Sequence, residues 1–408
     1  MRMKKEKICV GSLFSGIGAF EEALRQLKIP HKIAFACDNG EIELIPFDDL
    51  SKRKEYLDYE KRVRHLTDEE KSKHKVLKDE IAAVIDKIRK KCYEIKDKKQ
   101  RAEYVESLYK KYEGDNPNWP KKAYLANNKM HETAFHTDVR FMKGDEYRGK
   151  VDILVGGSPC QSFSTYGKKQ GLEDARGTLF YDYARIIKES QPRVFIYENV
   201  ASVKTNDHGR TWKTMLSVWE SLGYVIVHSI LNAADYNHPQ LRKRLFLIGF
   251  RKDIYTKQYK FPKKLELKKK STDFLEKSPV DDVYYLGQKG FEWVTTPEKN
   301  LRRSRVNQDV IGCETANQQD NWIGDFRVER PQPHHYNHER IYIGQYDFGN
   351  GPEDAVARKM TPRECLNLMG FSNKFKIVVD DRIAYRHAGN SIVVPVLKEL
   401  IKSLRPYL

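Results

Sequence analysis

The sequence lacks any apolar run that approaches the ~18 residues of a membrane-spanning helix, which excludes the integral membrane classes. Cysteine is scarce as well: there are six in 408 residues, and no two of them form a CxxC pair. This spacing argues against a zinc ribbon or a redox motif and suits a reducing cytoplasm, where we expect the protein to reside.

Acidic residues are outnumbered. Lys and Arg total 74 against 57 Asp and Glu, which is a formal net charge of +17. This surplus favours a polyanionic partner, most simply nucleic acid, although an anionic membrane surface is also complementary to it. Hydrophobic residues make up 39% of the chain, so a wholly disordered chain is excluded, and the length predicts two to three domains.

Glycine and proline are both missing from residues 51–113, where 34 of the 63 residues are charged. Apolar residues recur there at helical spacing, and a single straight helix would be about 95 Å long at ~1.5 Å per residue. We therefore predict a helical hairpin, inserted at about residues 48–120, with a solvated charged face. Contact with nucleic-acid phosphates and self-association are the alternative roles.

The rest of the chain alternates between short apolar runs and helix-like segments, which is typical of a doubly wound α/β sheet. Strands are expected at 8–14, 33–37, 151–156, 193–197, 224–231 and 245–250. Helices are expected at 18–27, 179–189, 210–222 and 391–404. Thr361, Pro362 and Glu364 predict one more helix start, as N-cap, first-turn proline and capping box.

Residues 251–355 lose this alternation and begin with a basic run, KFPKKLELKKK. We predict a main α/β domain at 1–255, a smaller loop- and strand-rich domain at 256–355, and a segment at 356–408 that completes the main domain.

Glycines follow the first expected strand in LFSGIGAFE (13–21). They let the backbone approach a ligand at a helix N-terminus, but Glu21 stands where a dinucleotide fingerprint has a small residue. A carboxylate there suits a cofactor with an ammonium or sulfonium cation better than a pyrophosphate. Asp38 ends the second strand, where an acidic residue can hold ribose hydroxyls. A purely structural turn is the alternative interpretation.

Two further motifs follow apolar strands. In GGSPCQSFSTYG (156–167), Cys160 lies on a polar, glycine-rich turn that suits a nucleophilic thiolate rather than an inert buried cysteine. In YENV (197–200), Glu198 follows VFIY, so desolvation is expected to raise its pKa and make it a proton donor. An ordinary ion-paired glutamate is the alternative for Glu198.

The fourth motif, QLRKRLFLIGF (240–250), places Arg242 and Arg244 on one side of a strand entry. Two such guanidinium groups can hold a phosphate or a base oxygen. A basic strand end that faces solvent is the alternative.

Together and in this order, the motifs resemble those of the DNA cytosine-5 methyltransferase family. The matching segments also include TDVRF (137–141), GLEDARGTLF (171–180), TPRECLNLMGF (361–371) and AGNSIVVPV (388–396). The resemblance covers 8–50, 131–250 and 356–405, whereas 251–355 matches only in position, as the variable target-recognition region. It implies a Rossmann-like S-adenosylmethionine-dependent methyltransferase sheet with a helical insertion and a smaller target-recognition domain.

The resemblance also implies the reaction: a methyl group passes from S-adenosylmethionine to C5 of a cytosine flipped out of a specific double-stranded DNA sequence. Cys160 matches the nucleophile that adds to C6, and Glu198 matches the acid that contacts N3 and the exocyclic amine. Arg244 matches the residue that binds the cytosine O2, and Arg242 matches one that steadies the loop and a backbone phosphate.

For the cofactor, the resemblance implies Phe14 against the adenine, Asp38 at the ribose and Asp138 at the adenine amine. The other implied contacts are Ser15, Gly16, Gly18, Phe20, Asn39, Val139, Pro159, Leu179, Asn390 and Ser391. Asn39 departs from the family, because many members have an aromatic or apolar residue there. Either the adenine loses one packing face or Ile42 supplies it.

In the family, the segment after the nucleophile closes over DNA, and glycine hinges and lysines suit that role. The DNA contacts that we expect are Ser164, Tyr166, Lys168, Lys169, Arg176 and Gln240. His334, His335 and His338 cluster in a proline-containing segment without a Cys/His ligand spacing, so we expect no metal. The polar residues of 300–350 are expected to read or position DNA instead.

We therefore expect a compact prokaryotic or phage enzyme, a monomer on DNA, from a restriction–modification system with a cognate endonuclease or from an orphan methylase. A tRNA cytosine methyltransferase is the first alternative, but that subfamily carries Cys-Phe-Thr after ENV, where this chain has ASVKTNDHG, and has a slim recognition region. A catalytically inactive DNA-binding protein is the second, and the retained Cys160 and Glu198 argue against it.

Tyr166 is expected to enter the space that the flipped base leaves in the duplex. Tyr166→Ala should therefore weaken flipping, and a 2-aminopurine probe at the target position should show a smaller fluorescence increase than with the wild-type protein. A signal equal to that of the wild type would contradict this role.

Overall fold

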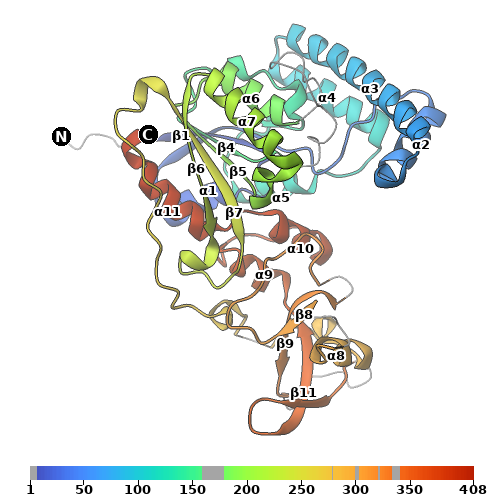
Figure 1. Ribbon diagram of the computed structural model, residues 1–408, viewed down its shortest axis with the longest axis vertical. Coiled ribbons are helices and arrows are strands. Elements are labelled where there is room, and N and C mark those ends of the chain that lie inside the picture. The colour runs from blue at the N-terminus through green and yellow to red at the C-terminus, as the bar shows by residue number, and fades with distance from the viewer. Residues whose placement is uncertain (1–6, 159–178, 278, 299–302, 320–321, 333–340) are drawn as a thin grey trace.

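The computed structural model describes residues 7–158, 179–277, 279–298, 303–319, 322–332 and 341–408. Within them, a seven-stranded sheet forms the larger part of the molecule and a four-stranded sheet forms the smaller part (Figure 1). The strands of the larger sheet are β1 (Ile8–Leu13), β2 (His31–Cys37), β3 (Phe135–His136), β4 (Ile153–Gly156), β5 (Val194–Val200), β6 (Tyr224–Asn232) and β7 (Lys243–Arg251).

The order of these strands is β3-β2-β1-β4-β5-β7-β6. The five strands from β3 to β5 are parallel, and β7 runs antiparallel to both β5 and β6. The chain first builds outward from β1 through β2 to β3, and then crosses to the opposite side of β1 with β4. Open α/β sheets hold ligands at the carboxyl ends of the strands where such a reversal occurs. The sheet therefore has one predicted binding position, between β1 and β4.

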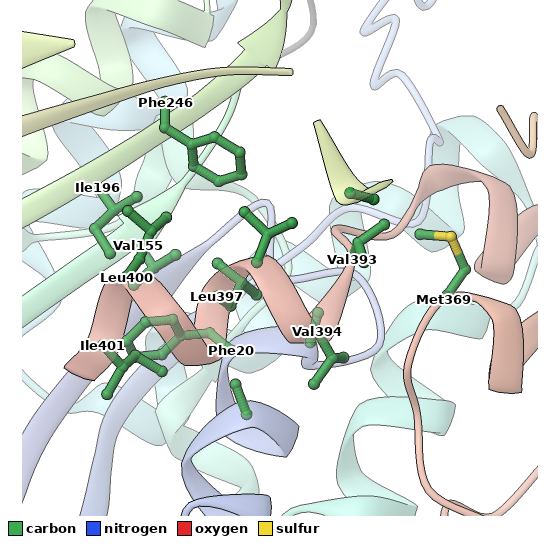
Figure 2. Packing of buried hydrophobic residues seen from close by; sticks show 14 of the residues in the cluster. Phe20, Val155, Ile196, Phe246, Met369, Val393, Val394, Leu397, Leu400 and Ile401 are labelled. Carbon is green, nitrogen blue, oxygen red and sulfur yellow. The ribbon is translucent and has the colours of Figure 1, made fainter. Parts of the chain in front are cut away.

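Helices cover both faces of this sheet, as the alternating sequence pattern predicts. On one face lie α1 (Ala19–Gln26) and α11 (Val394–Leu404), and on the other lie α6 (Leu179–Ser190) and α7 (Arg210–Ser221). Figure 2 shows Leu397, Leu400 and Ile401 of α11 beside Phe20 and Val155. The β5 run VFIY is fully buried because it is covered from both sides. No helix of the described residues is long and apolar enough to cross a membrane.

The region that lacks glycine and proline forms three helices rather than the predicted hairpin: α2 (Leu50–Lys61), α3 (Asp68–Glu94) and α4 (Lys98–Glu113). Side-chain caps at the helix N-termini, rather than glycine or proline, separate these helices. The Thr67 side chain accepts from the Glu70 N–H at 3.2 Å, and the Asp97 carboxylate accepts from the Gln100 N–H at 2.8 Å. A short helix, α5 (Trp119–Asn127), then leads back to the sheet.

The insertion has a core of its own, so it is more than a solvated face. Ile81, Ile85 and Ile88 of α3 pack with Tyr56 of α2 and Tyr109 of α4, and this cluster continues onto residues beside the sheet. The outer surface of the insertion carries most of its charged side chains, whereas Arg101 is buried and pairs with Glu146.

The smaller sheet has the order β10-β11-β9-β8. Its elements are β8 (Ser304–Val306), β9 (Gly324–Glu329), β10 (Gly344–Asp347) and β11 (Pro352–Lys359), with α8 (Gln288–Thr295) packed against them. Strand β11 leads into α9 (Pro362–Leu368) and α10 (Asp381–Asn390), which return the chain to the larger sheet. The predicted capping box is confirmed: the Thr361 hydroxyl accepts from the Glu364 N–H at 3.1 Å.

A buried ion pair joins the two parts. Both Arg358 on β11 and Glu364 on α9 are fully or nearly fully buried, and the guanidinium donates to the two carboxylate oxygens at 2.8 and 2.9 Å. Because Glu364→Ala leaves buried guanidinium hydrogen bonds unmatched, we expect it to lower the free energy of unfolding by about 3 kcal/mol in urea titrations.

Glu353→Ala is the matched control for that experiment. Glu353 pairs with Arg330 at 2.7 Å, but both side chains are exposed, so its removal should lower the free energy of unfolding much less than Glu364→Ala does. Equal losses in the two variants would contradict the importance of burial.

Candidate active site

A cavity of about 460 Å³ opens at the reversal between β1 and β4. Its walls come from the carboxyl ends of β1, β2, β4 and β5, from the start of α5, and from the end of α10. A larger cavity of about 700 Å³ lies at the other end of α1, beside Gln26 and Lys398, and shares no lining residue with the first. Most of the predicted catalytic and cofactor residues that the structure describes line the smaller cavity, which is therefore the candidate active site.

The loop after β1 turns into the cavity through residues with positive φ: Phe14 (51°), Gly16 (51°) and Gly18 (87°). Glycine adopts this conformation freely, whereas for a phenylalanine it is uncommon and is associated with functional sites. The Ser15 N–H donates to the Cys37 carbonyl at 3.0 Å, which ties the loop to the end of β2. The sequence motif thus produces a sharp turn whose backbone faces the cavity.

Asp38 lies directly after β2, beside this loop. Its carboxylate accepts hydrogen bonds from the N–H groups of Gly16 and Gly40, both at 2.8 Å. Burial raises the pKa of Asp38, and the two N–H donors partly oppose that rise. Each carboxylate oxygen has a second lone pair, so Asp38 can still accept hydrogen bonds from ligand hydroxyls.

Four buried polar atoms of the described cavity wall have no hydrogen-bond partner in the protein. Two of them are oxygens, Ser15 Oγ and Glu21 Oε2, and the other two are Arg242 Nε and His387 Nε2. The other oxygen of Glu21 accepts from the Tyr124 hydroxyl at 2.7 Å, and burial raises the pKa of this carboxyl group. Buried polar groups normally have partners. The two oxygens therefore suit a ligand that brings hydrogen-bond donors, such as an ammonium group.

Glu198 and Arg244 form the opposite side of the cavity, on the antiparallel pair β5 and β7. The Arg244 Nε lies 3.4 Å from the Glu198 Oε1, and the Glu198 side chain is only 15% exposed. Burial raises the pKa of Glu198, while Arg244 and Arg242 oppose the rise. The predicted direction of the shift is therefore matched, and the carboxyl group can carry a proton more readily than an exposed glutamate.

Arg242 is buried, and its guanidinium is committed to main-chain carbonyl groups. It donates to Glu314 at 2.6 Å, to Gly389 at 2.9 Å and to Ser391 at 2.7 Å. These acceptors come from two distant segments of the chain. Arg242 thus holds the rim of the cavity together, whereas the resemblance implies that it also steadies a loop and a DNA phosphate.

Asn199 is a structural contact that the sequence analysis did not single out, although it stands in the ENV motif. Its amide donates to the Ser158 carbonyl at 3.0 Å and to the Tyr197 hydroxyl at 2.9 Å. A Cβ at Gly157 would lie 2.1 Å from the Glu198 carbonyl oxygen. The strand ends of β4 and β5 are therefore joined tightly just before the position of Cys160.

The structure brings most of the described candidates together. The cavity is lined by Phe14, Ser15, Gly16, Phe20, Asp38, Asn39, Glu198, Arg242, Arg244, Asn390 and Ser391. The candidates that lie outside the described residues are Pro159, Cys160, Ser164, Tyr166, Lys168, Lys169 and Arg176.

Five candidates are not among the residues that line the cavity, although Gly18 belongs to the β1 loop beside it: Gly18, Asp138, Val139, Leu179 and Gln240. Asp138 is buried, ion-paired with Arg140 at 2.7 Å and hydrogen-bonded to the Tyr109 hydroxyl at 2.8 Å. Gln240 is fully buried and donates to the Leu368 carbonyl at 2.9 Å. The predicted DNA contact of Gln240 is therefore wrong, because its side chain belongs to the core and has no exposed surface for DNA.

Sequence reasoning missed two other parts of the cavity wall. Glu41 pairs with Arg386 and with the Asn390 amide, which closes one side. Trp119, at the start of α5, lines the cavity although the sequence pattern gave its segment no binding role. No motif pointed to either contact, since both depend on residues far apart in the chain.

Among the described residues, no group of three His, Cys, Asp or Glu side chains is arranged to hold a metal, and the three histidines of 334–338 lie outside them.

Comparison with known proteins identifies the family. The model of the C-5 cytosine-specific DNA methylase family matches residues 106–405. Type II methyltransferase M1.ScrFI of Lactococcus lactis subsp. cremoris is 36% identical over 274 residues, which are 64% of this chain and 67% of that protein. Type II methyltransferase M.HpaII of Haemophilus parainfluenzae is 36% identical over 267 residues, 62% of this chain and 72% of that protein.

Solved structures agree on the fold. The S. pombe Dnmt2 methyltransferase superimposes with a TM-score of 0.58 at 17% identity, covering 98% of this chain and 99% of its own. A putative DNA modification methyltransferase encoded within an E. coli prophage has a TM-score of 0.53, also at 17% identity, with coverage of 98% and 99%. At these identities the likeness concerns the fold alone, and it confirms the predicted Rossmann-like methyltransferase sheet.

The raised pKa of Glu198 predicts a pH-dependent cost in stability. Below the ordinary glutamate pKa of 4.5, Glu198 is protonated in both the folded and the unfolded protein. As the pH rises through the raised pKa of the folded state, folding must bury a charged carboxylate, and the wild-type protein loses stability. The free energy of unfolding of Glu198→Gln, relative to the wild type, should therefore rise between about pH 4 and pH 8 in urea titrations.

Glu353→Gln is the control, since the ion pair with Arg330 lowers the pKa of Glu353. Its free energy of unfolding relative to the wild type should fall as the pH rises toward the ordinary value of 4.5 and should then stay constant. A Glu198→Gln protein that loses stability relative to the wild type as the pH rises would contradict the prediction.

Proposed function

The chain belongs to the C-5 cytosine-specific DNA methylase family and is a DNA cytosine-5 methyltransferase, and we propose that it modifies a specific double-stranded sequence within a restriction–modification system. One observation carries the proposal: the β1 loop and Asp38 face the same cavity as Glu198 and Arg244. Cofactor-holding and base-holding groups from distant parts of the sequence thus share one site.

The cavity wall fits S-adenosylmethionine, which would supply the methyl group. Asp38 would accept hydrogen bonds from the ribose hydroxyls. Glu21 Oε2, which is buried without a partner, would accept from the ammonium group. Phe14 would pack against the adenine ring. We assign no metal to the reaction.

The catalytic step begins with the thiolate of Cys160, whose sulfur forms a bond to C6 of the flipped cytosine. The addition would make C5 electron-rich, and S-adenosylmethionine would supply the methyl group that C5 accepts. Departure of the C5 proton and of the Cys160 thiolate would restore the C5–C6 double bond and give 5-methylcytosine.

Glu198 and Arg244 assist this addition from the β5–β7 side. Glu198, whose pKa is raised by burial, would donate a proton to N3 of the cytosine while its other oxygen accepts from the exocyclic amine. Arg244, 3.4 Å from Glu198, would hold the cytosine O2. Arg242 is a positioning residue through its three carbonyl contacts, and Asn199 positions the turn before Cys160.

Residues 256–355 are proposed as the target-recognition domain, and 1–255 with 356–408 as the catalytic domain. DNA would lie between them, drawn by the net charge of +17 and covered by the segment that carries Ser164, Tyr166, Lys168, Lys169 and Arg176. The enzyme would act as a monomer. An endonuclease of the same sequence specificity would be its counterpart in the restriction–modification system. A tRNA substrate is not favoured.

Bisulfite sequencing of DNA from a methylation-free host tests the function. The wild-type protein should protect cytosines in one short recurring sequence, and Cys160→Ser should protect none because it lacks the nucleophile. Cys9→Ser, a partly exposed cysteine at the start of β1, is the matched control and should protect the same sites.

The possible failures are distinguishable. Absence of protected cytosines with folded wild-type protein would overturn the DNA function. Protection by Cys160→Ser would overturn the covalent mechanism alone.

A further inference from the structure

We infer that the cavity of about 700 Å³ at the far end of α1 is a second ligand site, which binds a free nucleoside monophosphate. Its walls come from the end of α1, from α9 and the loop that follows it, from the first half of α11, from His238 and from residues 269–277. No described residue lines both this cavity and the candidate active site. The inference therefore goes beyond the proposed function.

Basic side chains outnumber acidic ones in the wall of this cavity. The cations are Lys269, Lys277, Arg363 and Lys398, and the carboxylates are Asp273 and Glu276. Both carboxylates already accept hydrogen bonds from the protein. Asp273 accepts from the Lys270 N–H at 3.0 Å, and Glu276 accepts from the Thr361 hydroxyl. The cavity therefore carries a surplus of positive charge, which suits an anionic ligand.

Three of these cations, Lys269, Lys398 and Arg363, form no ion pair with a carboxylate of the described chain. The Lys398 ammonium donates to the Gln26 side-chain oxygen at 3.2 Å, and the Lys269 ammonium lies 5.5 Å from the centre of the Phe274 ring. The Arg363 guanidinium donates to main-chain carbonyl groups of the loop after α9, at 2.7 and 3.4 Å. An ammonium has three donors and a guanidinium has five, so each cation keeps donors for a ligand.

The positive charges in the wall act on one another. Burial lowers the pKa of Lys398, and the charges of Lys402 and Lys269 lower it further, although nearby carboxylates oppose this. Burial also lowers the pKa of Arg363. A phosphate group between these side chains would relieve their repulsion and form charge-assisted hydrogen bonds with them. Lys269 belongs to the basic run of 260–270, whose residues have no individual role in the proposed function.

The rest of the wall suits an aromatic base rather than a bare phosphate. Phe274 and Phe371 both line the cavity, and a planar base packs well against such rings. The side-chain oxygen of Asn367 is buried without a hydrogen-bond partner, while the amide nitrogen donates to the Phe274 carbonyl at 3.2 Å. A buried acceptor normally has a donor, and a base with an N–H group supplies one. The volume of the cavity is also that of a small-molecule site.

The test measures binding of guanosine 5′-monophosphate to the full chain by isothermal titration calorimetry. This probe has N–H donors on its base and differs from the adenine and the cytosine proposed for the other cavity. It should bind at least roughly tenfold more tightly than guanosine or inorganic phosphate, because each of these supplies only one half of the contacts. A saturating mixed-sequence DNA duplex should not displace it.

Two lysine substitutions locate the phosphate. Lys269→Gln and Lys398→Gln should each raise the Kd of guanosine 5′-monophosphate roughly tenfold, because each removes one charge-assisted hydrogen bond. Lys268→Gln is the matched control, since it removes the same charge from an exposed neighbour that pairs with Glu266 at 3.2 Å and does not line the cavity. The control should leave the Kd unchanged.

Asn367→Ala tests the base. It should raise the Kd of guanosine 5′-monophosphate roughly fivefold, because one hydrogen bond to the base is lost, and should leave the Kd of inorganic phosphate unchanged. An equal loss for both ligands would contradict a contact between Asn367 and the base.

Each remaining outcome is decisive. No binding at millimolar concentration, or equal Kd values for guanosine 5′-monophosphate and inorganic phosphate, would overturn the nucleotide as ligand. Displacement by the DNA duplex would overturn a free nucleotide in favour of a backbone phosphate. Equal Kd values for the wild type, Lys269→Gln and Lys398→Gln would overturn the cavity as the site, and so would an equal loss in Lys268→Gln.

The proposed function fails separately from this inference. Affinity for S-adenosylhomocysteine should be the same in the wild type and in all four variants, because the substituted residues do not line the candidate active site. A wild-type protein that binds guanosine 5′-monophosphate but no S-adenosylhomocysteine would overturn the proposed function and leave the second site standing.

Discussion

Strands β1 and β4 are hydrogen-bonded neighbours, with Val10 paired to Ile153, and the chain leaves them toward opposite sides of the sheet. In the part of the chain that the structure describes, no crossover covers the opening between their carboxyl ends, and the site occupies it. The strands meet there only because two glycines allow it. A Cβ would lie 2.3 Å from the Leu13 carbonyl oxygen at Gly156, and 2.1 Å from the Glu198 carbonyl oxygen at Gly157. Every proposed role in the cavity depends on this close approach.

Buried guanidinium groups then hold separate segments around that opening. Arg242 binds carbonyl groups of Glu314, Gly389 and Ser391, so the end of α10 stays at the cavity rim. Arg358 on β11 binds the Glu364 carboxylate on α9 and so joins the smaller sheet to the segment that leads back to the larger one. A buried charge needs all its partners in place. These residues therefore specify how the parts of the molecule meet, which weak surface ion pairs cannot do.

The insertion shows that a highly charged sequence can still belong to a binding site. Its outer surface carries the charge, while an apolar core and buried tyrosines face inward. Arg101, nearly fully buried, pairs with Glu146 at 2.7 Å and anchors α4 beside the sheet. The insertion thereby contributes Trp119 to a cavity whose other walls come from the sheet and from α10.

The amino-acid sequence alone determined the features that depend on neighbours along the chain. The VFIY run predicted a buried strand, Thr361 and Glu364 predicted a helix start, and the ordered motifs identified the family. The direction of the Glu198 pKa shift also followed from its apolar run. Tertiary structure decided the features that depend on distant partners: the three-helix insertion, the antiparallel pairing of β6 and β7, the burial of Gln240 against α9, and the presence of Trp119 in the cavity. Local sequence patterns indicate which residues are buried and where helices are capped, whereas long-range contacts arise only when the topology of the sheet brings segments together.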